Sequence, residues 1–215
     1  VNTMYLQIQT QRSLPEPERM LDAFRDIRLG CQLFQGLADT TMSHGEAWHF
    51  LRLGRKLERA DKTSRILDVK YFVLLPDESK IGSALDVVQW TALLESTSAL
   101  FMYRKRYGRI SPPLVAEFLL LDATFPRAVR FCVEQAETSL HSITGHPVGK
   151  NESPVESEFA SLHDHLQAAK IEPIIQEGLH EFIDACQCRL NDIGSTMYQA
   201  FFEIVPLEEV ASQRL

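Results

Sequence analysis

The sequence predicts an all-α protein: a bundle of about seven helices that includes one long central helix over about residues 44–75. Three observations carry this prediction. Apolar residues recur at helical spacing through most of the 215 residues. Val, Ile and Thr form no alternating runs, and no Asn-Gly or Asp-Gly pair marks a hairpin. Proline and glycine stand at intervals that suit the ends of helices.

The composition is that of an ordinary folded chain, with 45% hydrophobic and 24% charged residues and only 10 Gly and 10 Pro. These values exclude disordered, collagen-like and low-complexity classes. No stretch approaches the ~20 apolar residues that span a bilayer, and no signal-peptide pattern opens the chain. The four scattered cysteines indicate reduced thiols in a cytoplasmic protein. No metal-ligand spacing occurs, so we expect neither a metal nor a cofactor.

The first half of the chain is read as follows. Residues 2–10 are expected to end a helix that begins upstream, a turn follows at 13–17, and residues 18–40 form an amphipathic helix. The long central helix opens with Ser43 and Glu46, which have the form of a capping box, and it stops before the proline at 76. Its apolar positions follow a 3-4-3-4-3-4-3 spacing, which predicts a seam that packs on other helices: Phe50, Leu53, Leu57, Ala60, Ser64, Leu67, Tyr71 and Leu74.

After a loop at 76–83, a single helix is expected over about 84–107, ended by Gly108. A short helix begins after Ser111 and runs through Leu121. The next helix begins at Pro126 and closes at Gly145.

The clearest loop lies at 145–152, and Ser153 with Pro154 then begins another helix that runs towards Ala169. We expect a break near Pro173, followed by a last long helix that ends before residue 206. Residues 1–204 are interpreted as a single helical domain and residues 205–215 as a tail.

Charge is distributed unevenly along the chain. Residues 1–110 hold 16 basic and 13 acidic residues (+3), whereas residues 111–215 hold 6 basic and 16 acidic residues (−10), which together give the net charge of −7. The acidic balance argues against nucleic-acid binding by the whole protein. A local anion site in the first half remains open.

The central helix carries seven basic and three acidic residues between positions 52 and 70. One interpretation is a solvated face on which ion pairs three or four residues apart each contribute about 0.2–0.5 kcal/mol. The other is an anion site, because guanidinium groups bind carboxylates and phosphates bidentately, with Glu58 pairing an amine or orienting an arginine. If a neighbouring helix covers this face, its charges must be paired or must line a cleft.

Two smaller charged groups also have structural and functional interpretations. The basic run 104–109 lies at a helix C-terminus, where the helix dipole favours cations, but it also suits a phosphate- or RNA-contacting patch. Around residues 117–130, Asp122 is placed to cap the following helix, a role that we favour over catalysis.

Three stretches in the same order resemble the bacterial alpha-E family: residues 50–71, residues 89–94 with Tyr103-Arg104, and residues 116–122 with 125–129. The resemblance covers about residues 1–204 and implies an all-helical protein. Members of the family typically begin with a further segment carrying a similar Glu-Arg-Ala helix; we expect it to be missing here, which fits the start at Val1. One departure is Lys56, where the family commonly has Tyr.

The resemblance also implies site residues and partners. Alpha-E genes commonly neighbour those of circularly permuted ATP-grasp ligases and transglutaminase-like peptidases, which implies a protein partner of one of these kinds. Carried over position by position, the implied ligand-binding residues are Arg55, Glu58, Arg59, Thr63, Arg65 and Asp68, and weaker candidates are Glu117, Asp122 and Arg127.

We therefore expect a helical accessory protein that acts beside an ATP-grasp-type carboxylate–amine ligase in peptide synthesis or modification. Its central helix would bind an anionic group, a peptide or the partner's surface. Two alternatives stay open: an enzyme that uses Glu58 as general acid or base, which requires a concave site, and a purely structural bundle. The oligomeric state is not predicted.

Overall fold

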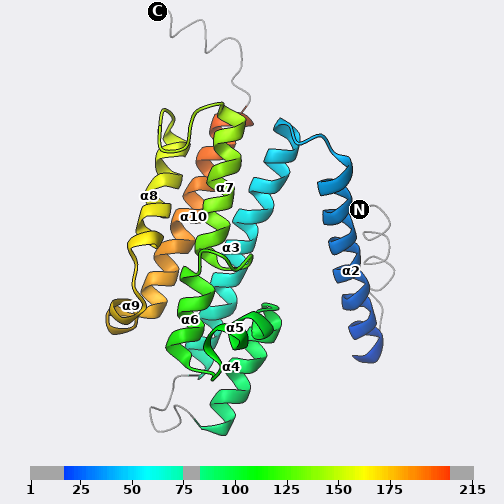
Figure 1. The fold of residues 1–215 in the computed structure, drawn as a ribbon, viewed down its shortest axis with the longest axis vertical. Helices are drawn as coiled ribbons and strands as arrows, with labels where there is room; N and C mark the ends of the chain where they lie inside the picture. The colour runs from blue at the N-terminus through cyan, green and yellow to red at the C-terminus, as the bar shows by residue number, and fades with distance from the viewer. Residues whose placement is uncertain (1–16, 75–82, 204–215) are drawn as a thin grey trace, which may run out of the picture. The chain divides into compact units, whose positions relative to one another are not determined.

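The computed structural model describes residues 17–74 and 83–203, and this part of the chain contains nine α-helices and no strand (Figure 1). The all-α prediction is confirmed, whereas the predicted number of about seven helices was wrong. The helices are α2 (Pro17–Thr41), α3 (Glu46–Leu74), α4 (Ala84–Ser96), α5 (Leu100–Tyr107), α6 (Pro112–Leu121), α7 (Val129–Thr144), α8 (Pro154–Ala168), α9 (Ile171–Glu177) and α10 (Leu179–Phe201).

The chain divides into two compact units, Val1–Trp48 and His49–Leu215. Helix α2 belongs to the first unit, and nearly all of α3 with the remaining helices belongs to the second. None of the described helices is both long and apolar enough to cross a membrane. Predicted features at 2–10, 13–16, 75–82 and 205–215 lie outside the described residues.

One additional helix arises because the segment predicted as a single helix over 84–107 is broken at 97–99. The Thr97 hydroxyl donates to the carbonyls of Leu93 and Leu94, both at 3.1 Å, and so competes with the helical pattern of α4. Ser98 then takes a positive φ of 54°, a conformation in which a helix of L-residues does not continue.

The other additional helix is α9. The sequence predicted a break near Pro173. In the structure this proline instead lies in the first turn of α9. A proline is tolerated there because the backbone N–H groups of a first turn have no intrahelical partner. Gly178, with a φ of 128°, separates α9 from α10.

Most of the predicted helix ends are confirmed. Gly108 and Gly145 take positive φ values of 74° and 77° and end α5 and α7. At the start of α8, Ser153 Oγ accepts from the Glu156 backbone N–H at 3.3 Å, and the Glu156 carboxylate accepts from the Ser153 N–H at 2.9 Å, which completes a capping box.

Two helix starts differ from the prediction. Helix α3 begins at Glu46 rather than near 44, and α7 begins at Val129 rather than at Pro126. The later start of α7 follows from Asp122, whose Oδ1 accepts from the backbone N–H groups of Thr124 and Phe125, both at 2.7 Å. Asp122 therefore holds a turn ahead of α7 instead of capping that helix directly.

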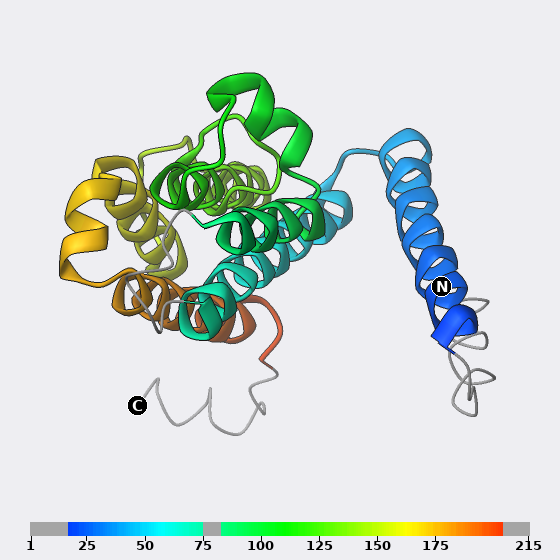
Figure 2. The ribbon, with the colours of Figure 1, turned by 90° about the horizontal axis from the view of Figure 1, so that it is seen from below.

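The core of the second unit forms where α8 packs on both α7 and α10, while α6 packs on α7 and α9. Figure 2 views these helices nearly end-on. The predicted seam of α3 enters this core: Leu53, Ala60, Ser64 and Leu67 are buried, and Phe50 and Leu57 pack against it. The side chains of Tyr71 and Leu74 lie outside the described part of the structure.

Candidate functional site

Part of the charged surface of α3 faces α7 rather than open solvent. The Arg52 guanidinium donates a hydrogen bond to Gln135 Oε1, and Lys56 Nζ lies 4.5 Å from the centroid of the Phe131 ring. Arg52, Lys56 and Arg59 follow each other at spacings of four and three residues, so they share one stripe of the helix. The stripe therefore runs along α7 and is partly covered by it.

Arg127 approaches the same stripe from the segment that precedes α7. Burial, and then the nearby charge of Arg59, lower the pKa of the Arg127 guanidinium, which still remains protonated. Burial also lowers the pKa of Lys56; Cys132 opposes this effect, whereas Arg59, Arg52 and Arg55 add to it. Arg59 is thus an electrostatic neighbour of both Lys56 and Arg127.

These cations gather around a buried thiol. Burial raises the pKa of Cys132 to about 11, although Lys56, Arg59 and Arg127 all act to lower it. Cys132 is fully buried and its thiol donates to the Pro126 carbonyl at 3.4 Å, which makes it a packing residue rather than a nucleophile. We call Lys56, Arg59 and Arg127 the cation cluster.

The cation cluster contains no carboxylate of the described chain. Arg59 and Arg127 make neither a hydrogen bond nor an ion pair with any described residue, and the contact found for Lys56 is the Phe131 ring. All three side chains are half-buried. Three positive charges therefore lie close together, partly shielded from water, without an internal counter-ion among the described residues.

The C-terminal half of α3 is different, because its charges are paired within the structure. Arg65 Nε donates to Asp61 at 2.9 Å, and Asp68 Oδ1 lies 2.8 Å from His180 Nδ1 of α10. Lys70 is buried and donates to Asp86 at 3.4 Å and to Gln89 at 3.1 Å. The last two contacts tie α3 to α10 and α4, and Lys62 pairs with the same Asp61 at 3.3 Å.

The residues implied by the resemblance therefore separate in space. Arg59 joins the cation cluster, and Arg55 lies half-buried on the same half of α3 with an interaction of its own. Thr63 is buried in the bundle, and Glu58 is exposed. Arg65 and Asp68 belong to the paired half described above.

The weaker candidates separate as well. Glu117 and Asp122 line one cavity of about 370 Å³ beside α6, which Arg106, Arg130 and Lys170 also line. Burial acts to raise the pKa of Asp122, but the hydrogen bonds from Thr124 and Phe125, with the nearby Arg106, outweigh it and lower the pKa. Arg127 lies instead with Arg59.

Sequence reasoning did not place Lys56 in the site, although its spacing from Arg52 and Arg59 was visible. It also could not connect Arg127 with Arg59, because the two are far apart in the chain and meet only through the packing of α7 on α3. No group of three or more His, Cys, Asp or Glu side chains suited to a metal ion occurs within residues 17–74 and 83–203.

Comparison with known proteins finds relatives of unknown function. Uncharacterised proteins of Mycobacterium tuberculosis and Mycobacterium bovis are each 20% identical to this chain over 191 residues. The match covers 86% of this chain but 21% of each relative, so the chain spans about a fifth of the length of the curated relatives it matches. No solved structure matches the chain significantly.

A family model matches nearly the whole chain, over residues 1–202. It is the model of Alpha-E, described as a predicted alpha-helical domain with a conserved ER motif. In α3 such a Glu-Arg pair is formed by Glu58 and Arg59, of which Arg59 belongs to the cation cluster. The described part of the chain is all-helical, as that description requires. The chain belongs to the Alpha-E family.

Proposed function

We propose that this chain is a helical accessory domain that binds an anionic group through the cation cluster. We further propose that it acts in the cytoplasm, beside an ATP-grasp-type carboxylate–amine ligase that makes or modifies a peptide. One observation carries the binding proposal. Between residues 52 and 70, Glu58 and Arg59 are the charged side chains that make no hydrogen bond, ion pair or ring contact with a described residue; Arg59 acts only through its charge on Lys56, Arg127 and Cys132.

The arrangement is unfavourable for a purely structural helix face. Like charges three or four residues apart destabilise a helix by about 0.2–0.5 kcal/mol per pair, and Arg52–Lys56, Arg55–Arg59 and Lys56–Arg59 are such pairs. Partial burial strengthens the repulsion, because the local dielectric constant is lower than in water. A bound carboxylate or phosphate removes this repulsion and gains bidentate hydrogen bonds from the two guanidinium groups.

The exposed carboxylate of Glu58 supports a role in binding rather than in catalysis. General acid–base chemistry favours a carboxyl group in a concave, desolvated site, whereas Glu58 faces solvent next to Arg59. At the edge of an anion site, such a group can pair with an amine of the same ligand or of a partner protein. An anion site flanked by a carboxylate suits a peptide that carries both charges.

The purely structural role fits the other half of the same helix. The Asp61–Arg65, Asp68–His180 and Lys70–Asp86 pairs are internal to the second unit and require no ligand. We therefore assign binding to residues 56–59 with Arg127, and a structural role to residues 61–70.

Pyrophosphate is a suitable probe, since it presents several oxygen acceptors in a small volume. At about ten times its Kd it should stabilise the native protein by ~1.4 kcal/mol and raise Tm by a few degrees. Differential scanning fluorimetry of Arg59→Met and Arg127→Met should show this increase lost. Arg65→Met is the matched control, because it removes an arginine of the same helix that is already paired. An equal increase of Tm in wild type and Arg59→Met would reject the site.

A further inference from the structure

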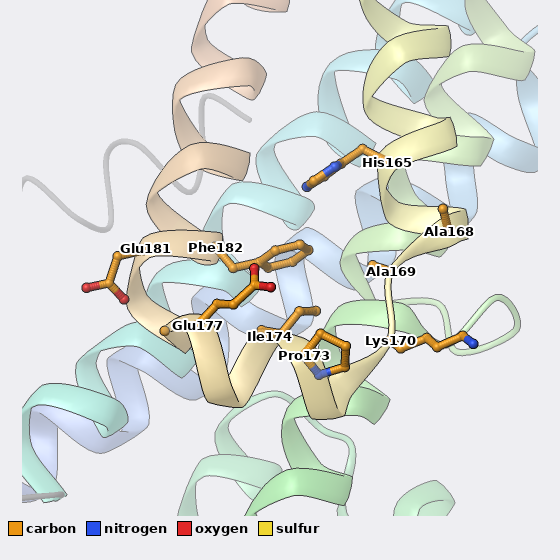
Figure 3. A pocket seen from close by; sticks show the side chains of 10 residues that line it. His165, Ala168, Ala169, Lys170, Pro173, Ile174, Glu177, Glu181 and Phe182 are labelled. Carbon is orange, nitrogen blue, oxygen red and sulfur yellow. The ribbon is translucent and has the colours of Figure 1, made fainter.

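A second cavity, apart from the cation cluster, is lined mainly by apolar side chains and by the carboxylate of Glu177. It is an open hollow lined by the end of α8, by α9 and by the start of α10, and has a volume of about 500 Å³, within the usual range for small-ligand sites (Figure 3). It exists because the chain leaves α8 at Ala169, makes the short helix α9 and reverses at Gly178 into α10.

The walls of this cavity are mainly apolar. Pro173 and Ile174 of α9 form one side, and the stacked rings of His165 and Phe182 form another, with their centroids 5.2 Å apart and an angle of 22° between the ring planes. Burial, together with the nearby Arg189, lowers the pKa of His165, so its ring is neutral at pH 7. These two sides therefore offer flat and aliphatic surface, and the ammonium group of Lys170, which also lines the cavity, extends away from it.

A carboxylate stands over this apolar surface. Figure 3 shows the Glu177 side chain turned over the hollow towards Phe182, whereas the side chains of Lys170 and Glu181 extend away from it. Glu177 makes no hydrogen bond or ion pair with a described residue. The hollow thus combines apolar walls with one negative charge that no described group neutralises.

We infer that this cavity binds an ammonium or guanidinium group carried on an aliphatic stem, with the cation on the Glu177 carboxylate and the stem between Ile174, Pro173 and Phe182. The lysine or arginine side chain of a peptide and a free alkylamine share this chemistry. A charge-assisted hydrogen bond holds the cation, and the apolar walls remove the methylene groups from water. An anionic ligand is excluded by Glu177, so this site is independent of the cation cluster.

The test is a ¹H–¹⁵N NMR titration of the full chain with three probes: Nα-acetyl-lysine methylamide, its Nε-acetylated form, and pentylamine. We expect the charged lysine probe to shift the amide signals of Ala169, Glu177 and Gly178, and the Nε-acetylated probe, which lacks the charge, to leave them unchanged. Pentylamine separates the two sources: equal affinity indicates a free amine, and weaker affinity indicates a peptide side chain.

Glu177→Gln should weaken binding of the charged probe about tenfold, the effect of one charge-assisted hydrogen bond. Glu172→Gln is the control, because it removes an exposed carboxylate from the same helix that does not line this cavity. Both variants change exposed side chains, so unchanged spectra without ligand verify their folding. Absence of shifts with both charged probes, or equal affinity in Glu177→Gln and wild type, overturns the inference.

Discussion

At the scale of single residues, the structure separates charges that are satisfied internally from charges that are not. Glu156 is the clearest satisfied case, since it is fully buried and accepts from Thr144 Oγ1 at 2.6 Å, from His146 Nδ1 at 2.9 Å and from two backbone N–H groups. Arg59 is the opposite case, since its neighbours are other cations. A buried carboxylate with several donors is structural, whereas a half-buried cation among cations is available to a ligand.

The pH dependence of stability should report on Glu156. Burial acts to raise its pKa, but the hydrogen bonds from Thr144, His146 and the backbone outweigh burial and lower the pKa to about 2, below the ordinary 4.5. Because the folded pKa is depressed, the stabilisation is complete above about pH 4.5 and is lost as pH falls towards 2. In urea unfolding, the free energy of unfolding of wild type should fall by about 3 kcal/mol between pH 4.5 and pH 2. Glu156→Gln should already lack this stabilisation at pH 7 and should not lose it again over the same range.

Glu152→Gln is the control for this measurement, since the Glu152 carboxylate is much more exposed and pairs at the surface with Lys150 and with the other ring nitrogen of His146. Its unfolding free energy should stay within about 0.5 kcal/mol of wild type. If the free energies of unfolding of wild type and Glu156→Gln changed in parallel with pH, the Glu156 carboxylate would not be the source of the pH dependence.

At the scale of elements, the chain reverses between α9 and α10 at a glycine with a positive φ, Gly178. Gly178 links α9 to α10 at a φ of 128°, and a Cβ built there would meet the Glu181 carboxylate. The carboxylate is the end of a flexible side chain and can move, so the backbone conformation decides the effect of a substitution.

Gly178→Ala should therefore destabilise the protein by about 1–2 kcal/mol. Gly194→Ala, within helix α10 and with open space around the added Cβ, should stabilise it by about 0.5–1 kcal/mol. Chemical denaturation of the two variants measures both effects. If Gly178→Ala stabilised the protein, the positive φ described at this position would be contradicted.

The element scale also shows what the sequence could predict. Caps formed by neighbouring residues, such as Ser153 with Glu156 and Gly145 at the end of α7, are local chemistry and were predicted correctly. The break at Ser98 was not, because the hydroxyl of Thr97 can bond to the helix backbone or to water, and its choice depends on burial. The meeting of Arg59 and Arg127 depends on how α7 packs on α3, which no local pattern encodes.

At the scale of the whole molecule, the chain matches only part of each of its curated relatives. Its curated relatives are about five times longer than the matched region, and the family description names a conserved ER motif, of which Glu58-Arg59 in α3 is a candidate. A helical domain that carries the proposed anion site at the cation cluster is suited to hold or present a ligand. This supports the proposal that chemistry is supplied by a partner.

Co-expression with an ATP-grasp-type carboxylate–amine ligase from the same organism tests the proposed partnership. We expect the tagged chain to retain the ligase through affinity and size-exclusion chromatography, and Glu58→Gln and Arg59→Met to lose the complex or its ligase activity. Arg65→Met should behave as wild type, since its charge is already paired. If the Glu58 and Arg59 variants kept both the complex and its ligase activity, the Glu-Arg pair would have no role in binding the ligase.

The most direct test of the account is the coupling free energy between Arg59 and Arg127, measured by urea unfolding of wild type, Arg59→Met, Arg127→Met and the double variant at low salt without added anion. Two cations that share no carboxylate repel each other, so we predict an unfavourable coupling of about 0.5 kcal/mol or more, which pyrophosphate reverses. A favourable coupling without any anion would show that the two arginines already share a counter-ion within the protein, and would contradict the proposed site.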